Sequence, residues 1–369
     1  MQKNKKIIIS GGGTGGHVFP AIAIADALRL QLIDPDILFV GARGRMEMEK
    51  VPESGYTIIG LPIEGFRRKL SLGNLKVIYK LLASLVKAGK LIRKFSPDVV
   101  VGVGGYASAP VLRKAARMGI PTLIQEQNSY AGVTNRLLAK KSHKICVAYE
   151  GMERYFPASK LVMAGNPVRK EIRELSARGN RTEARLEFGL NDDSSVLLIL
   201  GGSLGARSIN QAVLSGLELI FKSGIRVIWQ CGKYYYEDAK KSLGDTGNKS
   251  IVLHDFIRKM DQAYLAADAI ISRAGAITIS ELCHIGKPAI LVPSPNVAED
   301  HQTKNAQSLA DKSAAICIRD QEAGEKLIPA ALSLLKDPEQ MRMLSINIAG
   351  LAIDDSASLI AAEVIGIMK

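Results

Sequence analysis

Short, continuous apolar runs alternate with amphipathic stretches along the first half of the chain. The amphipathic stretches have helical spacing, as at 21–30 and 74–94. The apolar runs are rich in β-branched residues and read as strands: KIIIS (6–10), ILFV (37–40), YTIIG (56–60), DVVVG (98–102), PTLI (121–124) and KICVA (144–148). Strands that are apolar throughout and are separated by helices predict a parallel sheet covered on both faces.

The same pattern starts again after GNPVR (165–169) and a charged, helical stretch. Its apolar runs are SSVLLIL (194–200), RVIWQ (226–230), SIVLH (250–254), DAIIS (268–272) and PAILV (288–292). A chain of 369 residues is also long enough for two cores. The sequence therefore predicts two doubly wound α/β domains, residues 1–165 and 166–354. Ligands bind at the carboxyl ends of such strands, so we expect the glycine loops of both domains to face a shared cleft.

The first strand runs into GGGTGGHVFP (11–20), which satisfies G-x-G-x-x-G and so raises a dinucleotide hypothesis. An NAD site also wants an acidic residue at the end of the second strand, and FVGARGR (39–45) has none, although Arg43 would suit a 2′-phosphate. A second glycine loop, GVGGYASAP (102–110), follows DVVV. Two such loops in one domain favour close backbone approach to a large anion over NAD(P) binding.

Three small-residue or Pro-bounded loops follow strands of the second half. They are GGSLGARSIN (201–210), SRAGAITISE (272–281) and PSPNVAEDHQTKNA (293–306). Each alone has a simpler interpretation, a tight turn for the first and a helix-dipole partner for Glu281 in the second. Together they predict a nucleotide-sized site that holds phosphate on backbone amides and ribose hydroxyls on a carboxylate.

Composition excludes several classes of function. Residues 1–165 hold 25 Lys and Arg against 11 Asp and Glu, a net charge of +14, whereas the remainder nets −1. With 5% aromatic residues and no basic–aromatic interleaving, nucleic acid is not an expected partner. No apolar stretch is long enough to span a membrane, and the N-terminal run is too short for a secretory signal, so we expect the chain to stay in the cytoplasm. Four widely separated cysteines predict free thiols.

Residues 66–95 carry nine Lys and Arg and no acidic residue. Within the predicted helix, Ile78, Leu82, Leu85 and Ile92 share one stripe, and Lys76, Lys80, Lys87, Lys90 and Lys94 share another. An ordinary surface helix explains this spacing but not the absence of acids. A basic amphipathic segment that docks on anionic lipid explains both, so peripheral membrane binding is expected.

Seven motifs in order resemble the MurG family of bacterial glycosyltransferases, which add N-acetylglucosamine to undecaprenyl-pyrophosphoryl-N-acetylmuramoyl-pentapeptide. They are GGTGGHVFP (12–20), GVGGYASAP (102–110), QEQN (125–128), GNPVR (165–169), GGSLGARSIN (201–210), SRAGAITISE (272–281) and DHQTKNA (300–306). The resemblance implies a GT-B fold of two Rossmann-like domains, with the lipid-linked acceptor on the first and UDP-N-acetylglucosamine on the second. It also implies that a C-terminal helix, about 355–369, packs back on the first domain.

The resemblance also implies roles for residues at matching positions. Ile257 would offer backbone groups to uracil, Glu281 would bind ribose hydroxyls and Arg169 would face the pyrophosphate. The implied UDP-N-acetylglucosamine residues are Thr14, Gly15, Gly16, Asn128, Arg169, Ser203, Ile257, Ala276, Ile277, Thr278, Ile279, Ser280, Glu281 and Gln302. The implied acceptor residues are Gly13, His17, Gly104, Gly105 and Tyr106. Leu204 departs from the family, which often has Gln there, so a side-chain contact from that position is lost.

Transfer to a sugar 4-hydroxyl requires stabilisation of the leaving diphosphate and removal of a proton. The formal D-x-D match, Asp34-Pro35-Asp36, lies in a predicted turn away from the site, so neither a metal nor another cofactor is expected. Helix N-termini, Ser203 and Arg169 would take the place of the cation. His17 is the preferred general base and Glu126 the reserve. The family's reaction inverts the anomeric centre and gives a β-1,4 link.

Other functions remain open at this stage. A UDP-N-acetylglucosamine 2-epimerase or another GT-B glycosyltransferase needs neither the basic segment nor GGTGGHVFP. A nucleotide-sugar-binding scaffold would keep the second-half loops but has no use for His17. The preferred hypothesis is a peripheral enzyme on the cytoplasmic face of the bacterial plasma membrane.

Overall fold

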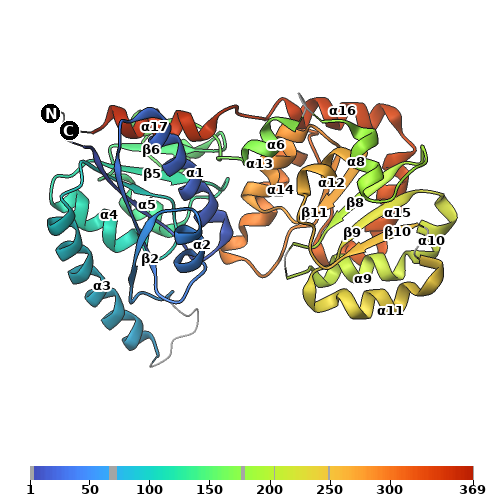
Figure 1. Cartoon of the computed structure of the whole chain (residues 1–369), viewed down its shortest axis with the longest axis horizontal. Helices are drawn as coiled ribbons and strands as arrows, with labels where there is room; N and C mark the ends of the chain where they lie inside the picture. The colour runs from blue at the N-terminus through green and yellow to red at the C-terminus, as the bar shows by residue number, and fades with distance from the viewer. Residues whose placement is uncertain (1–3, 66–72, 176–178, 203, 248–249, 369) are drawn as a thin grey trace. The chain divides into compact units, whose positions relative to one another are not determined.

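The computed structural model describes residues 4–65, 73–175, 179–202, 204–247 and 250–368, and the chain divides into two units (Figure 1). Unit 1 comprises Met1–Val168 and Ile353–Lys369, and unit 2 comprises Arg169–Ala352. The division thus falls three residues beyond the sequence-predicted boundary, inside the GNPVR motif.

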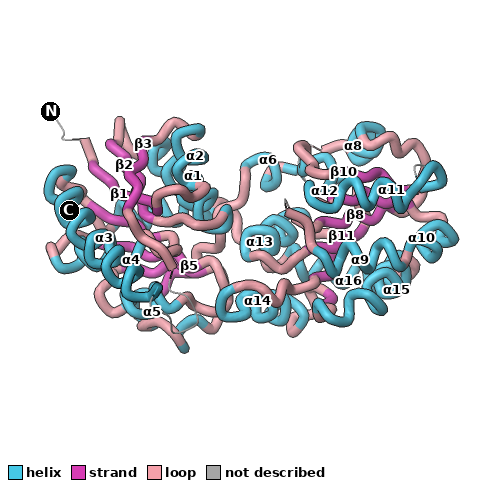
Figure 2. The backbone as a smooth tube through the Cα atoms, turned by 90° about the horizontal axis from the view of Figure 1, so that it is seen from below, coloured by secondary structure: helices cyan, strands magenta, loops and turns pink. Residues whose placement is uncertain are grey.

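Unit 1 is built on a parallel sheet of seven described strands in the order β3-β2-β1-β4-β5-β6-β7 (Figure 2). The strands are β1 (Lys6–Ser10), β2 (Asp36–Ala42), β3 (Thr57–Leu61), β4 (Val99–Gly102), β5 (Thr122–Glu126), β6 (Lys144–Val147) and β7 (Leu161–Met163). The helices are α1 (Gly15–Gln31), α2 (Glu47–Glu53), α3 (Gly73–Phe95), α4 (Ser108–Arg117), α5 (Val133–Ala139), η1 (Met152–Arg154), η2 (Ala158–Lys160) and α17 (Ser356–Gly366).

Alternation along β1 shows why both faces of this sheet are covered. Ile7 and Ile9 point into a core that α1 and α17 complete, whereas Ile8 points into the opposite core with residues of α3 and α4. All three isoleucines are fully buried. A strand buried on both faces must be apolar at successive positions, and this requirement produces the uninterrupted KIIIS run.

The C-terminal helix α17 belongs to unit 1, where it packs along α1 (Figure 1). Ile360 and Val364 are fully buried in the same core as Ile24 and Leu28 of α1. Residues more than 300 positions apart in the chain therefore share one core, and the last helix completes the first unit.

Unit 2 has a parallel sheet of six described strands in the order β10-β9-β8-β11-β12-β13. The strands are β8 (Val196–Leu200), β9 (Arg226–Gln230), β10 (Ile251–His254), β11 (Ala269–Ser272), β12 (Ala289–Leu291) and β13 (Ile316–Cys317). The helices are α6 (Lys170–Arg173), α8 (Arg181–Glu187), α9 (Arg207–Ser215), α10 (Leu217–Ser223), η3 (Lys233–Tyr235), α11 (Tyr236–Gly247), α12 (Met260–Ala266), α13 (Ala276–Ile285), η4 (Ala298–Asp300), α14 (His301–Ala310), η5 (Asp320–Glu322), α15 (Ala323–Leu335) and α16 (Pro338–Ala349).

The two doubly wound sheets confirm the predicted fold class, with two additions. β7 and β13 are short edge strands that the apolar pattern did not reveal, because two or three residues at a sheet edge leave too little periodicity to recognise. Helix α1 also begins earlier than predicted, at Gly15, inside the glycine motif. Its first turn therefore contains the motif's last glycine and His17.

Candidate active site

The two glycine loops of unit 1 pack directly against each other, because they follow the neighbouring strands β1 and β4. A Cβ atom on Gly105 would lie 2.3 Å from the carbonyl oxygen of Gly12, and one on Gly11 would lie 2.2 Å from Cγ2 of Val103. Backbone therefore touches backbone, and Gly105 has φ +81°, which larger residues rarely adopt. Glycine is required here for contact between the loops.

His17 lies where these loops meet. Its Nδ1 is 3.2 Å from the hydroxyl oxygen of Thr14, within hydrogen-bonding distance. A Cβ atom on Gly104 would lie 2.8 Å from its Nε2, so the far edge of the ring faces the second loop. A ring oriented through one nitrogen and directed across a loop with the other has the geometry of a general base.

The reserve base, Glu126, is buried and carries four hydrogen bonds. Its Oε1 accepts from the backbone N–H of Asn128 at 3.1 Å and from its side-chain amide at 3.3 Å. Its Oε2 accepts from the N–H of Gly132 at 3.0 Å and the side-chain amide of Asn135 at 2.8 Å. This carboxylate therefore organises the loop between β5 and α5, and it fixes the side chain of Asn128, one of the implied sugar-binding residues.

A buried amide network joins QEQN to GNPVR. The Gln127 amide donates to the carbonyl of Val103 at 2.7 Å, the Gln125 amide to Asn166 Oδ1 at 2.9 Å, and the Asn166 amide to the carbonyl of Gln127 at 3.0 Å. Neither motif by itself indicates this contact. Both motifs lie at the carboxyl ends of strands of the same sheet, and this shared position was the available signal.

The remaining residues implied for this unit are Gly13, Gly15, Gly16 and Tyr106. Gly15 and Gly16 form the first turn of α1, and the ring of Tyr106 is 54% exposed. The N–H of Gly13, by contrast, donates to the buried carboxylate of Glu47 at 2.8 Å. Gly13 was expected to bind the acceptor, but in this structure its amide is committed to an internal partner.

Glu281 is the centre of a polar cluster in unit 2. Arg169 donates to Glu281 Oε1 from Nε at 3.0 Å and from Nη2 at 2.8 Å, and the Tyr264 hydroxyl donates to Oε2 at 3.2 Å. Glu281 is only 7% exposed. Burial opposes the charge on Arg169, but the attraction of Glu281 outweighs it and raises the pKa of Arg169. Burial, followed by the charge of Glu281, raises the pKa of Tyr264 well above its usual range.

Helix α13 begins at Ala276, four residues after the last residue of β11, so its amino end lies at the carboxyl end of that strand. Gly275 caps the helix in extended conformation and supplies no side-chain cap, so the first amides, from Ala276, Ile277 and Thr278, can serve an anion. Ile279 is buried, and the Ser280 hydroxyl donates back to the carbonyl of Ala276 at 3.1 Å. Of the implied set, therefore, three residues offer backbone N–H groups, whereas the side chain of Ile279 lies in the core and the Ser280 hydroxyl is bonded within the helix.

The loops around this helix are held by residues that sequence analysis did not single out. Arg273 donates to the carbonyls of Val292 at 3.0 Å and Pro293 at 3.2 Å, to the Ser208 hydroxyl at 3.0 Å, and to Asp320. One guanidinium thereby connects the loops after β11 and β12 to α9 and η5. The SRAG motif contained this arginine, but none of its partners is near it in sequence.

Gln302 and Ile257 are both already hydrogen-bonded. Oε1 of Gln302 accepts from the N–H of Ser294 at 2.9 Å, which closes the loop between β12 and α14. In the same loop Glu299 and Asp300 have φ of +53° and +54°, a strained conformation that often accompanies functional loops. The N–H of Ile257 donates to Gln230 Oε1 at 2.8 Å, so uracil can use this N–H only if Gln230 turns away.

Three further predictions from sequence concern Ser203, the D-x-D triplet and the cysteines. Ser203 lies outside the described residues, while its neighbour Leu204 is 65% exposed. Asp36 opens β2, and Asp34 accepts from the side chain of Asn4 at 2.9 Å. The D-x-D triplet therefore lies at the amino ends of the strands, opposite the glycine loops. All four cysteines are free.

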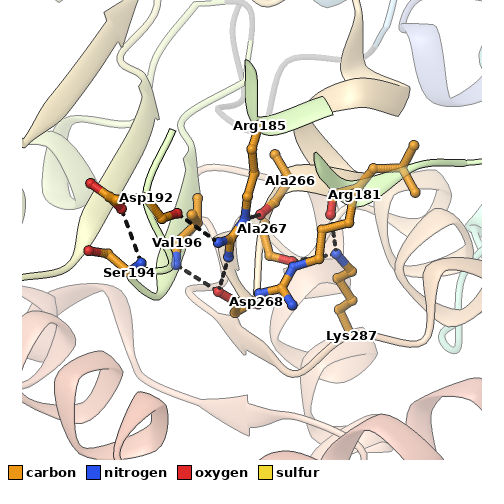
Figure 3. Close-up of polar contacts among 10 residues, drawn as sticks. Arg181, Arg185, Asp192, Ser194, Val196, Ala266, Ala267, Asp268 and Lys287 are labelled. Atoms are coloured by element: carbon orange, nitrogen blue, oxygen red, sulfur yellow. Dashed lines mark hydrogen bonds and ion pairs between the residues drawn. The ribbon is translucent and has the colours of Figure 1, made fainter. Parts of the chain in front are cut away.

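A second polar cluster holds the C-terminal end of α12, the helix that carries Tyr264 (Figure 3). Lys287 donates to the carbonyl of Leu265 at 2.7 Å and also to that of Ala267, and Arg185 donates to the carbonyl of Ala266 at 3.3 Å. Asp268 accepts from Arg185 at 2.8 Å and balances the charge. Cations thus occupy the negative end of the helix dipole.

Lys287 should make the stability of the protein depend on pH. Burial lowers its pKa from the ordinary 10.5 to about 8, so between these values the unfolded chain binds more protons than the folded one. Stability then rises with pH over this interval. We expect the free energy of unfolding of the wild type, minus that of Lys287→Met, to increase between pH 8 and 10.5 by up to about 3 kcal/mol. Urea unfolding at several pH values measures it, and a difference that stays flat contradicts the expectation.

Both family models and individual known proteins are similar to this chain. The models of the glycosyltransferase family 28 N-terminal and C-terminal domains match residues 7–147 and 196–359. A UDP-N-acetylglucosamine--N-acetylmuramyl-(pentapeptide) pyrophosphoryl-undecaprenol N-acetylglucosamine transferase of Parabacteroides distasonis is 55% identical over 100% of this chain and 99% of its own length. The crystal structure of Acinetobacter baumannii MurG is similar with a TM-score of 0.80 and 29% identity, covering 98% and 99% of the two chains.

A more distant likeness concerns the fold alone. A UDP-GlcNAc 2-epimerase from Neisseria meningitidis has a TM-score of 0.67 and 16% identity, covering 98% of this chain and 100% of its own. The same two-unit architecture thus serves more than one reaction, and the residues of the site have to distinguish between them.

Proposed function

The chain belongs to glycosyltransferase family 28, and on this premise we infer that it transfers N-acetylglucosamine from UDP-N-acetylglucosamine to undecaprenyl-pyrophosphoryl-N-acetylmuramoyl-pentapeptide in peptidoglycan synthesis. The observation that carries this conclusion is the full-length match to relatives with that activity in their names, at 55% and 56% identity for two of them. The match spans both units.

We propose that unit 2 binds the sugar nucleotide through an exchange of partners at Glu281. A carboxylate has about four acceptor positions, and three of those on Glu281 are occupied by Arg169 and Tyr264. One position is free, so two ribose hydroxyls need at least one of the two places that Arg169 holds. The Arg169 side chain is 52% exposed and can turn away. Once released, it meets the diphosphate beside the amino end of α13.

The chemical step that we propose uses His17 of unit 1. The 4-hydroxyl oxygen of the acceptor attacks the anomeric carbon of N-acetylglucosamine as its proton moves to the imidazole. The bond from that carbon to the diphosphate breaks with inversion, and the electron pair leaves on UDP. Amides of α13 and the released Arg169 stabilise the charge that develops on the leaving group. No step in this scheme requires a metal ion.

The test is a transfer assay with UDP-N-acetylglucosamine and a short-chain lipid-linked muramoyl-pentapeptide in the presence of EDTA. We expect the disaccharide product at an undiminished rate. Formation of UDP-N-acetylmannosamine from the sugar nucleotide alone would instead favour the epimerase. Nucleotide binding without any turnover would favour a scaffold.

Helix α3 of unit 1 supports a further proposal, that the protein binds the cytoplasmic face of the membrane peripherally. Among the described residues no helix is both long and apolar enough to cross a bilayer. Four large apolar side chains of α3 are nevertheless exposed, at 45%, 72%, 58% and 58%: Ile78, Tyr79, Leu82 and Val86. Exposed apolar groups that cluster on one helix indicate an interaction surface.

The structure revises the two stripes expected on this helix. Ile92 is fully buried while Ile78 and Leu82 are exposed, so the apolar stripe enters the core only in its second half. Lys80 pairs with Glu64, and Lys87 donates to the carbonyl of Gly60 at 2.7 Å. Lys90 and Lys94 are exposed. Residues 66–72, which hold three of the basic side chains, lie outside the described residues.

Removing two of the exposed apolar side chains should weaken membrane binding. We expect Leu82→Gln with Val86→Gln to lower partition onto vesicles with anionic lipid by about tenfold or more, since each buried aliphatic side chain contributes about 1.5–3 kcal/mol. Co-sedimentation at low salt measures the effect. The matched control, Leu219→Gln with Ile346→Gln, changes two apolar side chains of unit 2 that are 48% and 58% exposed and should leave partition unchanged. Equal binding of the wild type to neutral vesicles would contradict the electrostatic contribution.

A further inference from the structure

A buried carboxylate lies behind the first glycine loop. Glu47 opens α2, and it is 1% exposed. Its Oε2 accepts from the N–H of Gly13 at 2.8 Å, and its Oε1 accepts from the N–H of Ala42 at 2.9 Å. One side chain thereby connects the end of β2 to the loop that follows β1. Burying a carboxylate is costly unless it is well hydrogen-bonded, so these two bonds are essential to its presence.

The space around this carboxylate is shaped for it. A Cβ atom on Gly12 would lie 2.1 Å from Oε1, and one on Gly41 would lie 2.5 Å from Cγ of Glu47. Gly12 and Gly13 also have φ of +148° and +92°, values that other residues rarely adopt. Glycine on both sides makes room for the side chain. The unusual loop conformation then turns the Gly13 amide toward it.

The acceptor chemistry explains why a carboxylate occupies this place. Both oxygens of an ionised carboxyl group accept hydrogen bonds, whereas a glutamine amide has only one acceptor oxygen. Glutamine of the same shape would direct an NH₂ group at one of the two N–H donors and leave it unpaired. Of these two side chains of equal length, only glutamate can therefore accept both hydrogen bonds.

The loop that Glu47 holds leads within four residues to His17. Thr14 follows Gly13, caps α1 and lies 3.2 Å from the imidazole Nδ1. We propose that Glu47 is a positioning residue for the transfer reaction: it fixes the first glycine loop so that His17 faces Gly104. This inference rests on the proposed function. Because the Gly13 N–H is bonded to Glu47, it is not available to bind an anion. A pyrophosphate must therefore bind to amides further along the loop.

The experiment compares Glu47→Gln with Glu49→Gln, a matched change at an exposed carboxylate of the same helix. We expect Glu47→Gln to lower kcat about 10- to 100-fold, as a misplaced catalytic group does. UDP affinity, a property of unit 2, should stay within about twofold, because the substitution leaves its contacts unchanged. The Gly13 amide should exchange faster with deuterium. Glu49→Gln should match the wild type in all three measurements.

A double variant tests whether Glu47 acts through His17. If it does, His17→Ala with Glu47→Gln is no slower than His17→Ala alone, because the two residues serve one function. Rate losses that multiply would overturn the proposal. So would a wild-type kcat in Glu47→Gln once amide exchange shows that the Gly13 bond is broken.

Two further arms cover the remaining outcomes. If Glu47→Gln does not fold, Gly41→Ala displaces the carboxylate from a position within β2 and should again lower kcat with UDP affinity kept. An unchanged kcat in that variant counts against the proposal. If the wild type itself makes no product, the proposed function fails and the positioning role fails with it. Amide exchange at Gly13 then still reports on the hydrogen bond by itself.

Discussion

Replacing His17 with alanine should slow transfer by about 10²- to 10⁴-fold, the usual contribution of a general base. The structure supports this expectation through the orientation of the ring, with Nδ1 at the Thr14 hydroxyl and Nε2 toward Gly104. Steady-state kcat with both substrates saturating measures the change.

Controls separate catalysis from folding in this experiment. His143 is another histidine of unit 1, before the amino end of β6, where its Nδ1 accepts from the N–H of Thr122 at 3.2 Å. His143→Ala should retain most of the activity. UDP affinity should be unchanged in both variants. A His17→Ala enzyme with wild-type kcat would remove His17 as the base, and Glu126 would not replace it easily, because its four hydrogen bonds hold it within its own loop.

Replacing Glu281 with alanine should raise KM for UDP-N-acetylglucosamine by about 10²-fold, since hydrogen bonds to charged groups contribute about 1.5–3 kcal/mol each. The variant loses the acceptor for the ribose hydroxyls. It also leaves Arg169 and Tyr264 without the carboxylate that orders them. Steady-state kinetics with saturating acceptor measures the change.

The ligand itself provides the sharpest control for this second prediction. The wild type should bind 2′-deoxy-UDP more weakly than UDP, whereas Glu281→Ala should bind both equally, because the partner of the missing hydroxyl is gone. Tyr264→Phe removes one hydrogen bond to Glu281 but keeps the carboxylate, so its KM should rise only a few-fold. If Glu281→Ala still discriminates between the two nucleotides, the ribose role is wrong.

Much of the fold could be predicted from the chain alone. The apolar runs located eleven of the thirteen described strands, and both sheets are parallel as expected. The glycine and small-residue loops were predicted correctly to follow strands. In a parallel sheet covered by helices, the connections lie only at the amino and carboxyl ends of the strands. The strands that were missed, β7 and β13, are each an edge strand of their sheet and are too short to produce a pattern.

The partners of the site residues were much harder to predict. Glu47 was not predicted, although it lies only two residues beyond the FVGARGR segment (39–45) at the end of the second strand. Tyr264, Gln230 and Arg273 were missed as well. Each makes its contact with a residue at least 17 positions away along the chain. Local periodicity carries no information about such contacts.

The sequence by itself determined the order of most strands and helices, because burial on one or two faces imposes a period that can be read along the chain. Glycine and small residues at strand ends also marked the loops in which we expect the chemistry to take place. Only the tertiary structure decided which hydrogen bonds those loops make. Gly13 donates to Glu47 because the parallel strands β1 and β2 bring their connections together, and Arg169 reaches Glu281 because α6 packs against α13. Each buried polar group must then find its partner among these neighbours in space.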